Sequence, residues 1–184
     1  MFAPNKKQEY SDDKFSILNF SNDKGKFKRI EAKDESLCIL PFDTNEQGQI
    51  KNVYLFKYKD YLSDSDESRC ITETLDPNTS DSYYEAVVSC LNREAGISEM
   101  DVDQVFYLGK VKHTVPFTKS YRCYAVNISD HLNQEGNLAT LPGVEPSQHF
   151  HSVEKVRFNR LLKGEVCDSL ALACSALLLS YLSE

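Results

Sequence analysis

The sequence predicts an α/β (α+β) fold in which a mixed β-sheet lies between helices. The first indication is the order of the elements: β-prone runs are followed by a helix, further β-prone runs and a last helix. The second is the segment SDSYYEAVVSCLNREAGI (residues 80–97), whose apolar residues recur at helical spacing. The third is an apolar helical segment near the C-terminus. This order of elements favours a sheet sandwiched between helices.

The expected strands are short β-prone runs bounded by turn residues. Residues 14–32 predict a hairpin whose turn lies at Asn22–Gly25. Ser36–Phe42 has the low polar content of a buried strand, and Val53–Lys59 is the returning strand. The acidic, serine-rich residues 60–67 are expected to form a surface loop. Further strands are expected at residues 69–75, 103–111, 120–129 and 151–159.

Both helices carry recognisable end signals. In the first helix, Asp81 or Ser82 is the expected N-cap, Glu85 stands at capping-box spacing from Ser82, and Gly96 ends the helix. Asp168 is the expected N-cap of the terminal helix. Because that helix is apolar nearly all round, it is expected to be deeply packed or covered by a partner.

Length and charge limit the classes of function. The 184 residues predict one domain, 15–184, preceded by a polar N-terminal arm, 1–14. With 28 acidic and 21 basic residues, the net charge of −7 argues against nonspecific nucleic-acid binding and against a polybasic membrane anchor. There is no signal-peptide pattern, and the C-terminal apolar stretch is too short to span a bilayer. We therefore expect a soluble, intracellular protein.

Cysteine and histidine give no metal signature by spacing. The six cysteines form no CxxC pair and have no zinc-like spacing with histidine, so unpaired core thiols in a reducing compartment are expected. His149 and His151 would point to one face of a strand, but no third ligand lies near them in the sequence. The cysteines are residues 38, 70, 90, 123, 167 and 174.

Residues 80–97 resemble, register for register, the signature helix of the Nudix hydrolases, GX5EX7REUXEEXGU, where U is aliphatic. With Gly96 on the last glycine, Leu91 and Ile97 take the aliphatic positions. The segment SLCILPFDTNEQGQIKNVYLFKYKDY looks like the first long hairpin of the family. LLKGEVCDSLALACSALLL looks like the C-terminal helix of its ADP-ribose pyrophosphatase branch. The resemblance implies a Nudix-type α/β/α sandwich with a mixed central sheet.

The charges of this box are degenerate. In the family, the glutamates hold divalent metal ions that activate water against a diphosphate. Here Leu75 replaces the opening glycine, Ser89 and Cys90 replace the Arg-Glu pair, and Arg93 replaces the next glutamate. Arg93 would place a cation where a second metal ligand belongs. The box positions that remain, or nearly so, are Asp81, Glu85, Leu91, Glu94, Gly96 and Ile97.

Three functions are compatible with this pattern. The leading hypothesis is a non-catalytic Nudix-fold protein that needs no cofactor and binds other protein chains through its N-terminal arm and C-terminal helix. Its Asn-, Ser- and Asp-rich composition without tryptophan would suit a structural protein of a virus or phage. The second is a divergent hydrolase of nucleoside diphosphate derivatives such as ADP-ribose. Its Mg²⁺ or Mn²⁺ would be held by Glu94 and Asp81, with Glu85, Glu73 or Glu145 as further acids. The third is a sensor that binds a nucleotide without turnover.

Overall fold

A computed structural model describes residues 5–11, 14–22, 25–60, 65–75, 82–113, 117–138, 150–165 and 168–183. Its strands are β1 (Asn5–Ser11), β2 (Phe15–Asn22), β3 (Gly25–Thr44), β4 (Ile50–Asp60), β5 (Ser65–Arg69), β6 (Ile71–Thr74), β7 (Val105–His113), β8 (Phe117–Asn127) and β9 (Phe150–Arg157). Its α-helices are α1 (Tyr83–Ala95), α2 (Phe158–Leu162) and α3 (Ser169–Tyr181). None of these described helices is long and apolar enough to cross a membrane.

Strand β3 is the centre of a mixed sheet. It pairs in antiparallel fashion with β2, β4 and β6, and in parallel fashion with β8. Strand β4 continues the sheet toward β5 and β9, and β7 pairs with β8 on the other side. The mixed sheet that the sequence predicts is therefore confirmed.

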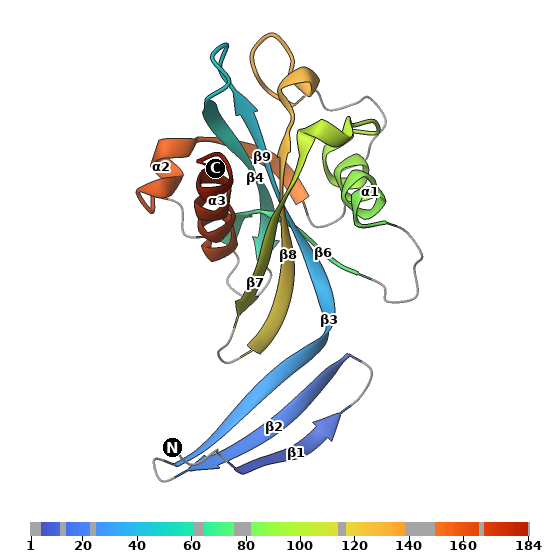
Figure 1. Cartoon of the computed structure of the whole chain (residues 1–184), viewed down its shortest axis with the longest axis vertical. Helices are drawn as coiled ribbons and strands as arrows, with labels where there is room; N and C mark the ends of the chain where they lie inside the picture. Colours follow the sequence, from blue (N-terminus) through green and yellow to red (C-terminus); the bar gives the residue numbers. More distant parts are fainter. Residues whose placement is uncertain are drawn as a thin grey trace.

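Helices cover both faces of this sheet. Figure 1 shows α2 and α3 on one side and α1 on the other. Alternate residues of β3 point to opposite faces, because side chains in a strand alternate. Cys38 and Leu40 pack in the core beneath α3, whereas Leu37 and Ile39 pack against α1. The α/β/α sandwich expected from the resemblance is confirmed.

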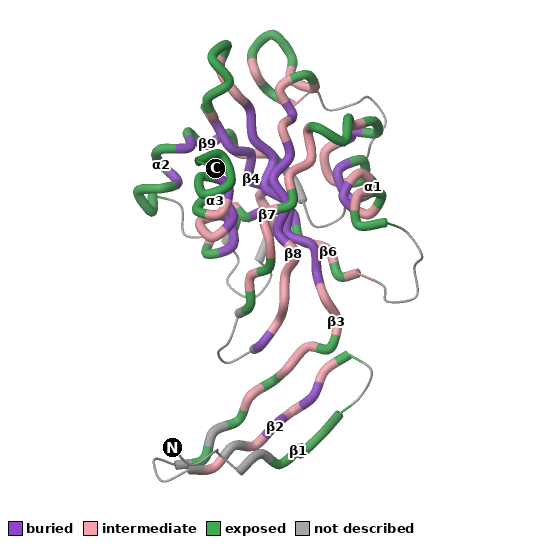
Figure 2. The backbone as a smooth tube through the Cα atoms, viewed as in Figure 1, coloured by how far each residue is buried: buried purple, intermediate pink, exposed green. Residues whose placement is uncertain are grey.

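The N-terminal strands extend away from this sandwich. Strands β1 and β2 and the first half of β3 form an antiparallel sheet at the lower end of the molecule in Figure 1, which we call the wing (residues 5–33). The predicted hairpin is present, with Asn22 paired to Gly25. Residues 5–11, which the sequence analysis assigned to a polar arm, pair with β2 as strand β1. Burial in Figure 2 is concentrated in the sandwich and is sparse in the wing.

Two local predictions were wrong. Residues 65–67, expected in a loop, belong to β5 and pair with the end of β4. The last strand was expected to run to residue 159, but it ends at Arg157 and helix α2 follows. Phe158 and Leu161 are both buried, and their i, i+3 spacing places them on one face of α2. One helical turn thus buries two apolar side chains that a continued strand would point to opposite faces.

A charged cluster lies where β3 passes from the wing into the sandwich. Glu35 accepts hydrogen bonds from Lys110 Nζ at 2.6 Å and from Arg122 Nε. The Arg122 guanidinium also lies 3.9 Å from the centre of the Tyr83 ring at the start of α1. Burial alone would raise the pKa of Glu35, but the hydrogen bonds from Lys110 and Arg122 outweigh burial and lower it. The cluster connects β3, β7, β8 and α1.

We predict that Glu35→Gln destabilises the protein at neutral pH by about 0.5–1 kcal/mol, since the group is partly exposed and its pairs are screened. A folded-state pKa below the unfolded value contributes stability at high pH that disappears as the pH falls through the folded value. The difference from wild type should therefore shrink below the ordinary carboxyl pKa near 4.5. Urea unfolding measured from pH 7 to pH 3 checks this, with Glu46→Gln in the exposed β3–β4 turn as control. A difference that is independent of pH would contradict the prediction.

Candidate functional site

Helix α1 has the ends that its sequence predicts. Ser82 Oγ accepts the backbone N–H of Glu85 at 3.2 Å, and Glu85 Oε2 accepts the N–H of Ser82 at 2.7 Å. This reciprocal pair is a capping box. Gly96 ends the helix at φ 70°, a left-handed conformation that glycine adopts without steric cost. The carboxylate of Glu85 is thus used at the start of the helix.

The aliphatic positions of the box pack against the sheet. Leu91 is fully buried and Ile97 is 4% exposed, both in the core that contains Leu37, Ile39 and Phe56. Apolar burial of this kind stabilises by about 25 cal/mol per Å². These positions are explained by packing, whichever chemistry the helix carries.

Arg93 joins two carboxylates on the polar side of α1. Its Nε donates to Glu94 Oε1 at 3.1 Å, and its Nη2 donates to Glu73 Oε2 on β6. The Glu94 side chain is only 10% exposed, so this pair is partly removed from water. Burial works to lower the pKa of Arg93, but the hydrogen bond to Glu94 outweighs burial and raises it. The guanidinium therefore stays charged between the two acids.

Two side chains that stay uncharged at physiological pH, Cys90 and Tyr58, and one further cation lie beside the Arg93 cluster. Cys90, which stands at a box glutamate position, is 1% exposed, and burial raises its thiol pKa to about 12. Burial, and next to it the charge of Glu94, also raises the pKa of Tyr58. The Arg69 guanidinium lies 4.2 Å from the centre of the Tyr58 ring. A second cation therefore lies beside the same cluster.

The described residues do not fit a magnesium or manganese site of the Nudix kind. Mg²⁺ needs several oxygen ligands in near-octahedral geometry. Glu73 and Glu94 do converge, but both are bound to Arg93, and Glu85 caps the opposite end of the helix. Asp81 and Glu145, two further candidate acids, lie outside the described residues, as do His149 and Cys167.

Sequence reasoning named Glu73, Arg93 and Glu94 but did not find that they bind one another. Glu73 and Arg93 are twenty residues apart, on a strand and on a helix. The sequence did contain a signal for this pairing: Arg93 stands at a metal-ligand position, and its charge is opposite to that of Glu73. Tyr58 and Arg69 were not identified as members of the cluster, because nothing in their local sequence distinguishes them.

Comparison with solved structures shows the fold. The chain is similar to a protein described as an ADP compounds hydrolase, with a TM-score of 0.62, 14% identity, and coverage of 100% of this chain and 96% of that one. It is also similar to the NUDIX domain of Shewanella oneidensis NrtR in complex with ADP ribose. There the TM-score is 0.56, the identity is 12%, and coverage is 82% of this chain and 89% of that one.

A third similar structure is the C-terminal domain of mouse MUTYH in complex with human PCNA. Its TM-score is 0.51 at 14% identity, with 83% of this chain and 91% of that one covered. No protein-family model matches the sequence, and no curated protein sequence matches it. At these identities the similarities establish that the chain has the Nudix fold, as its box helix predicts.

We predict that the wild type does not bind Mn²⁺ at the box helix, because the Arg93 guanidinium lies between its two carboxylates. Arg93→Glu removes this cation and adds a third carboxylate beside Glu73 and Glu94. The variant should bind Mn²⁺ weakly, with a Kd of about 10⁻⁴–10⁻³ M, by analogy with low-affinity calcium sites built from oxygen ligands. Calorimetry and Mn²⁺ paramagnetic resonance measure this, with Arg93→Gln as the control that removes the cation without adding an acid. Glu94-dependent Mn²⁺ binding by the wild type would disprove the interpretation.

Proposed function

We propose that this chain is a non-catalytic Nudix-fold protein that acts by binding other protein chains. The observation that carries the proposal is the position of Arg93, whose guanidinium pairs with both Glu73 and Glu94. At about 4 Å, each unit of positive charge on an incoming metal ion would be repelled by about 1–4 kcal/mol at effective dielectric constants of 80 to 20. Because Arg93 neutralises their charge, Glu73 and Glu94 can lie close together without a metal ion.

The similar structures support the binding half of this proposal and leave its catalytic half to experiment. One of them is described as a hydrolase, which keeps hydrolysis as the alternative to be tested. Two others are described in complexes, one with ADP ribose and one with the protein PCNA. The fold therefore accommodates ligand binding and protein binding in proteins of similar structure.

One face of the wing offers an apolar surface for a partner. Tyr10 pairs with Ile17, and Ile17 pairs with Ile30, so these three side chains share one face of the wing. Phe15 and Ala32 are paired neighbours on the same face, two residues further along. Tyr10 is 48% exposed and Ile30 is 36% exposed. We call this surface the wing stripe.

A second copy of the chain is the partner proposed for the wing. The wing stripe of one copy can pack face to face on the wing stripe of a second copy across a two-fold axis, which would bury the exposed side chains of Tyr10 and Ile30. The end of α3 supplies a second apolar surface, formed by Leu179, Tyr181 and Leu182, which are all exposed. This surface would contact a further chain in a larger assembly, a virion being one example.

The first test is hydrolysis. We expect no turnover of ADP-ribose, NADH, dinucleoside polyphosphates or nucleoside triphosphates in Mg²⁺ or in Mn²⁺, measured by a phosphatase-coupled assay on folded protein. Glu94→Gln serves as the matched variant, because it keeps the shape of the one core metal-binding acid that remains. Turnover by the wild type that Glu94→Gln abolishes would replace this proposal with the hydrolase alternative.

The second test is association. Light scattering on purified protein should give a mass of twice the 21.0 kDa of one chain. Ile30→Glu should return the protein to a monomer, because it places a charge in the wing stripe. Val102→Glu is the control, since Val102 is 68% exposed on the sandwich. A wild type that is monomeric at micromolar concentration, or a dimer unaffected by Ile30→Glu, would contradict the assignment of the wing stripe.

A further inference from the structure

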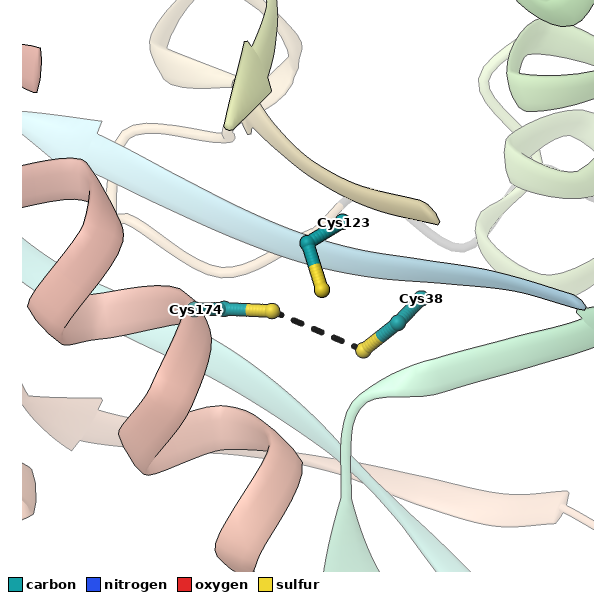
Figure 3. Close-up of side chains that lie close together, drawn as sticks. All are labelled: Cys38, Cys123 and Cys174. Atoms are coloured by element: carbon teal, nitrogen blue, oxygen red, sulfur yellow. Dashed lines mark hydrogen bonds between the residues drawn. The ribbon is translucent and has the colours of Figure 1, made fainter. Parts of the chain in front are cut away.

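Cysteines from four separate parts of the chain meet on the α3 side of the sheet. Cys38 lies on β3 and Cys123 on β8, and the two are direct partners in the parallel pairing of these strands. Cys174, on α3, packs against this pair. Figure 3 shows the three side chains pointing toward one another. Cys70, between β5 and β6, is fully buried in the same core, outside the group of three sulfurs that lie closest together.

The spacing of the sulfurs suits a single metal ion. Cys38 Sγ lies 3.6 Å from Cys174 Sγ, and the Sγ atoms of Cys38, Cys123 and Cys174 are all within 4.8 Å of one another. With zinc–sulfur bonds of about 2.3 Å, two sulfurs on a tetrahedral Zn²⁺ lie ~3.8 Å apart. Changes of up to about 1 Å in these separations would therefore bring the three sulfurs onto one ion.

We infer that Cys38, Cys123 and Cys174 form a buried binding site for a thiophilic metal ion, Zn²⁺ or Cu⁺, with Cys70 as the fourth ligand. Thiolate sulfur selects such soft or borderline ions over Mg²⁺ and Mn²⁺, which prefer oxygen. The site is therefore chemically distinct from the box helix on the other face of the sheet. Each cysteine that coordinates the ion gives up its thiol proton, so binding releases protons to the solvent.

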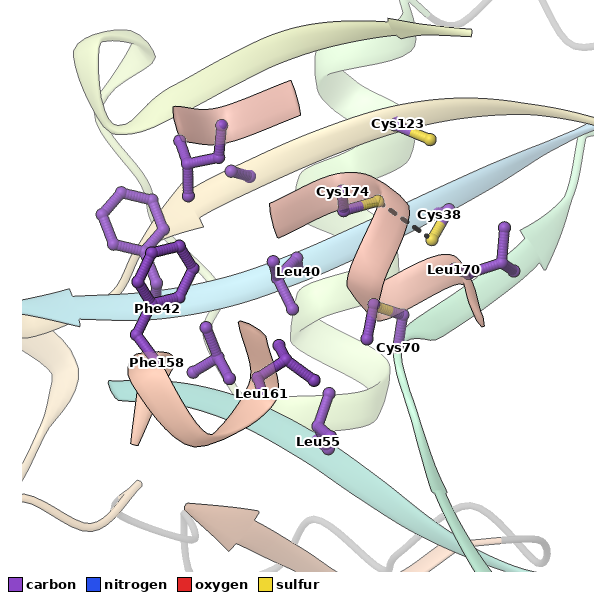
Figure 4. Close-up of a cluster of buried hydrophobic side chains, with 14 of the residues drawn as sticks. Cys38, Leu40, Phe42, Leu55, Cys70, Cys123, Phe158, Leu161, Leu170 and Cys174 are labelled. Atoms are coloured by element: carbon purple, nitrogen blue, oxygen red, sulfur yellow. Dashed lines mark hydrogen bonds between the residues drawn. The ribbon is translucent and has the colours of Figure 1, made fainter. Parts of the chain in front are cut away.

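Simple core packing accounts less well for this arrangement. A lone thiol behaves as a small apolar group, and Cys90 fits that description among the side chains that pack α1 onto the sheet. In contrast, Cys38 Sγ and Cys174 Sγ lie 3.6 Å apart with Cys123 beside them, and Figure 4 shows these residues with Cys70 in the core beneath α3. All four residues have no exposed surface, as expected of a closed structural site and not of a catalytic one with an open position.

Asp168 positions one of these ligands. Its Oδ1 caps α3 by accepting the N–H of Leu170 at 3.0 Å, and its Oδ2 accepts the N–H of Cys70 at 2.8 Å. The same carboxylate thus fixes Cys70 relative to the helix that carries Cys174. Residues that do not bind the metal ion themselves but hold its ligands in position are common in metal sites.

An acidic pocket lies near the cluster. It has a volume of about 550 Å³, and its lining includes Leu170 and Asp168, whose Oδ2 accepts the N–H of Cys70. Its other carboxylates raise the local concentration of cations near the cluster. These are Asp66, Glu67, Glu154 and Glu165.

The test is metal binding by the full chain, reduced and stripped of metal under anaerobic conditions. Zn²⁺ is added in competition with a chromophoric indicator, and Cu⁺ is added in a parallel experiment against a colorimetric Cu⁺ chelator. We expect one Zn²⁺ or one Cu⁺ to bind per chain in at least one of these two experiments. For the zinc-loaded protein, X-ray absorption should show only sulfur neighbours at about 2.3 Å. The thermal midpoint should rise on loading, because the ion binds the folded state.

Variants locate the site. Cys174→Ala and Cys38→Ala should lose stoichiometric binding, whereas Cys90→Ala, a buried cysteine on the opposite face, should retain it. The absorption spectrum of the loaded wild type tests the inference even if a cluster variant fails to fold. The inference is overturned if the reduced, folded wild type binds neither ion, or if the bound ion has oxygen or nitrogen neighbours only. Unchanged binding by Cys174→Ala, or a Cys38–Cys174 disulfide in place of metal binding in the cell, would also overturn it.

Discussion

The alternation of side chains along β3 determines where every other part of the molecule is placed. This strand pairs with β2 in the wing and with β4, β6 and β8 in the sandwich, so its register is fixed on both edges. A slip of one residue would exchange the two faces, placing Leu37 and Ile39 under α3 and Cys38 under α1. Both cores would then be mismatched at once. The cost of such a mismatch keeps the box helix on one face and the cysteine cluster on the other.

On the α1 face, packing and chemistry have separate residues. Leu91 and Ile97 are buried and hold the helix on the sheet, and Gly96 ends it in a left-handed conformation. Of the metal-binding positions, Arg93 and Glu94 lie on the polar side, where a substitution changes charge without opening a cavity in the core, whereas Cys90 is buried in that core. Arg93 is tolerated there because Glu73 and Glu94 both pair with it, so that no buried charge is left unpaired. A helix can therefore keep the Nudix frame while its metal ligands are replaced.

The sequence predicted the parts of this structure that depend on neighbouring residues. Ser82, Glu85 and Gly96 fix the ends of α1 through contacts within four residues, and Asp168 caps α3 in the same local way. Helix α2 was missed because a single turn has too few residues to show a helical period. The pairing of Arg93 with Glu73, and the cluster of Cys38, Cys70, Cys123 and Cys174, depend on the register between distant strands and on the docking of α3. No spacing rule in one dimension describes them, which is why the cysteines looked like unrelated core thiols.

The position of the cysteine cluster connects the metal site to the proposed association of the wing. The wing leaves the sandwich along β3, and the charged cluster around Glu35 lies at that exit, three residues before Cys38. A partner bound to the wing would transmit force along β3 into the sandwich, where parallel pairing with β8 resists it. A metal ion held by Cys38, Cys123 and Cys174 would join β3 covalently to β8 and α3 at this point. It would thus strengthen the sandwich where the wing is anchored, on the face of the sheet that the degenerate box does not use.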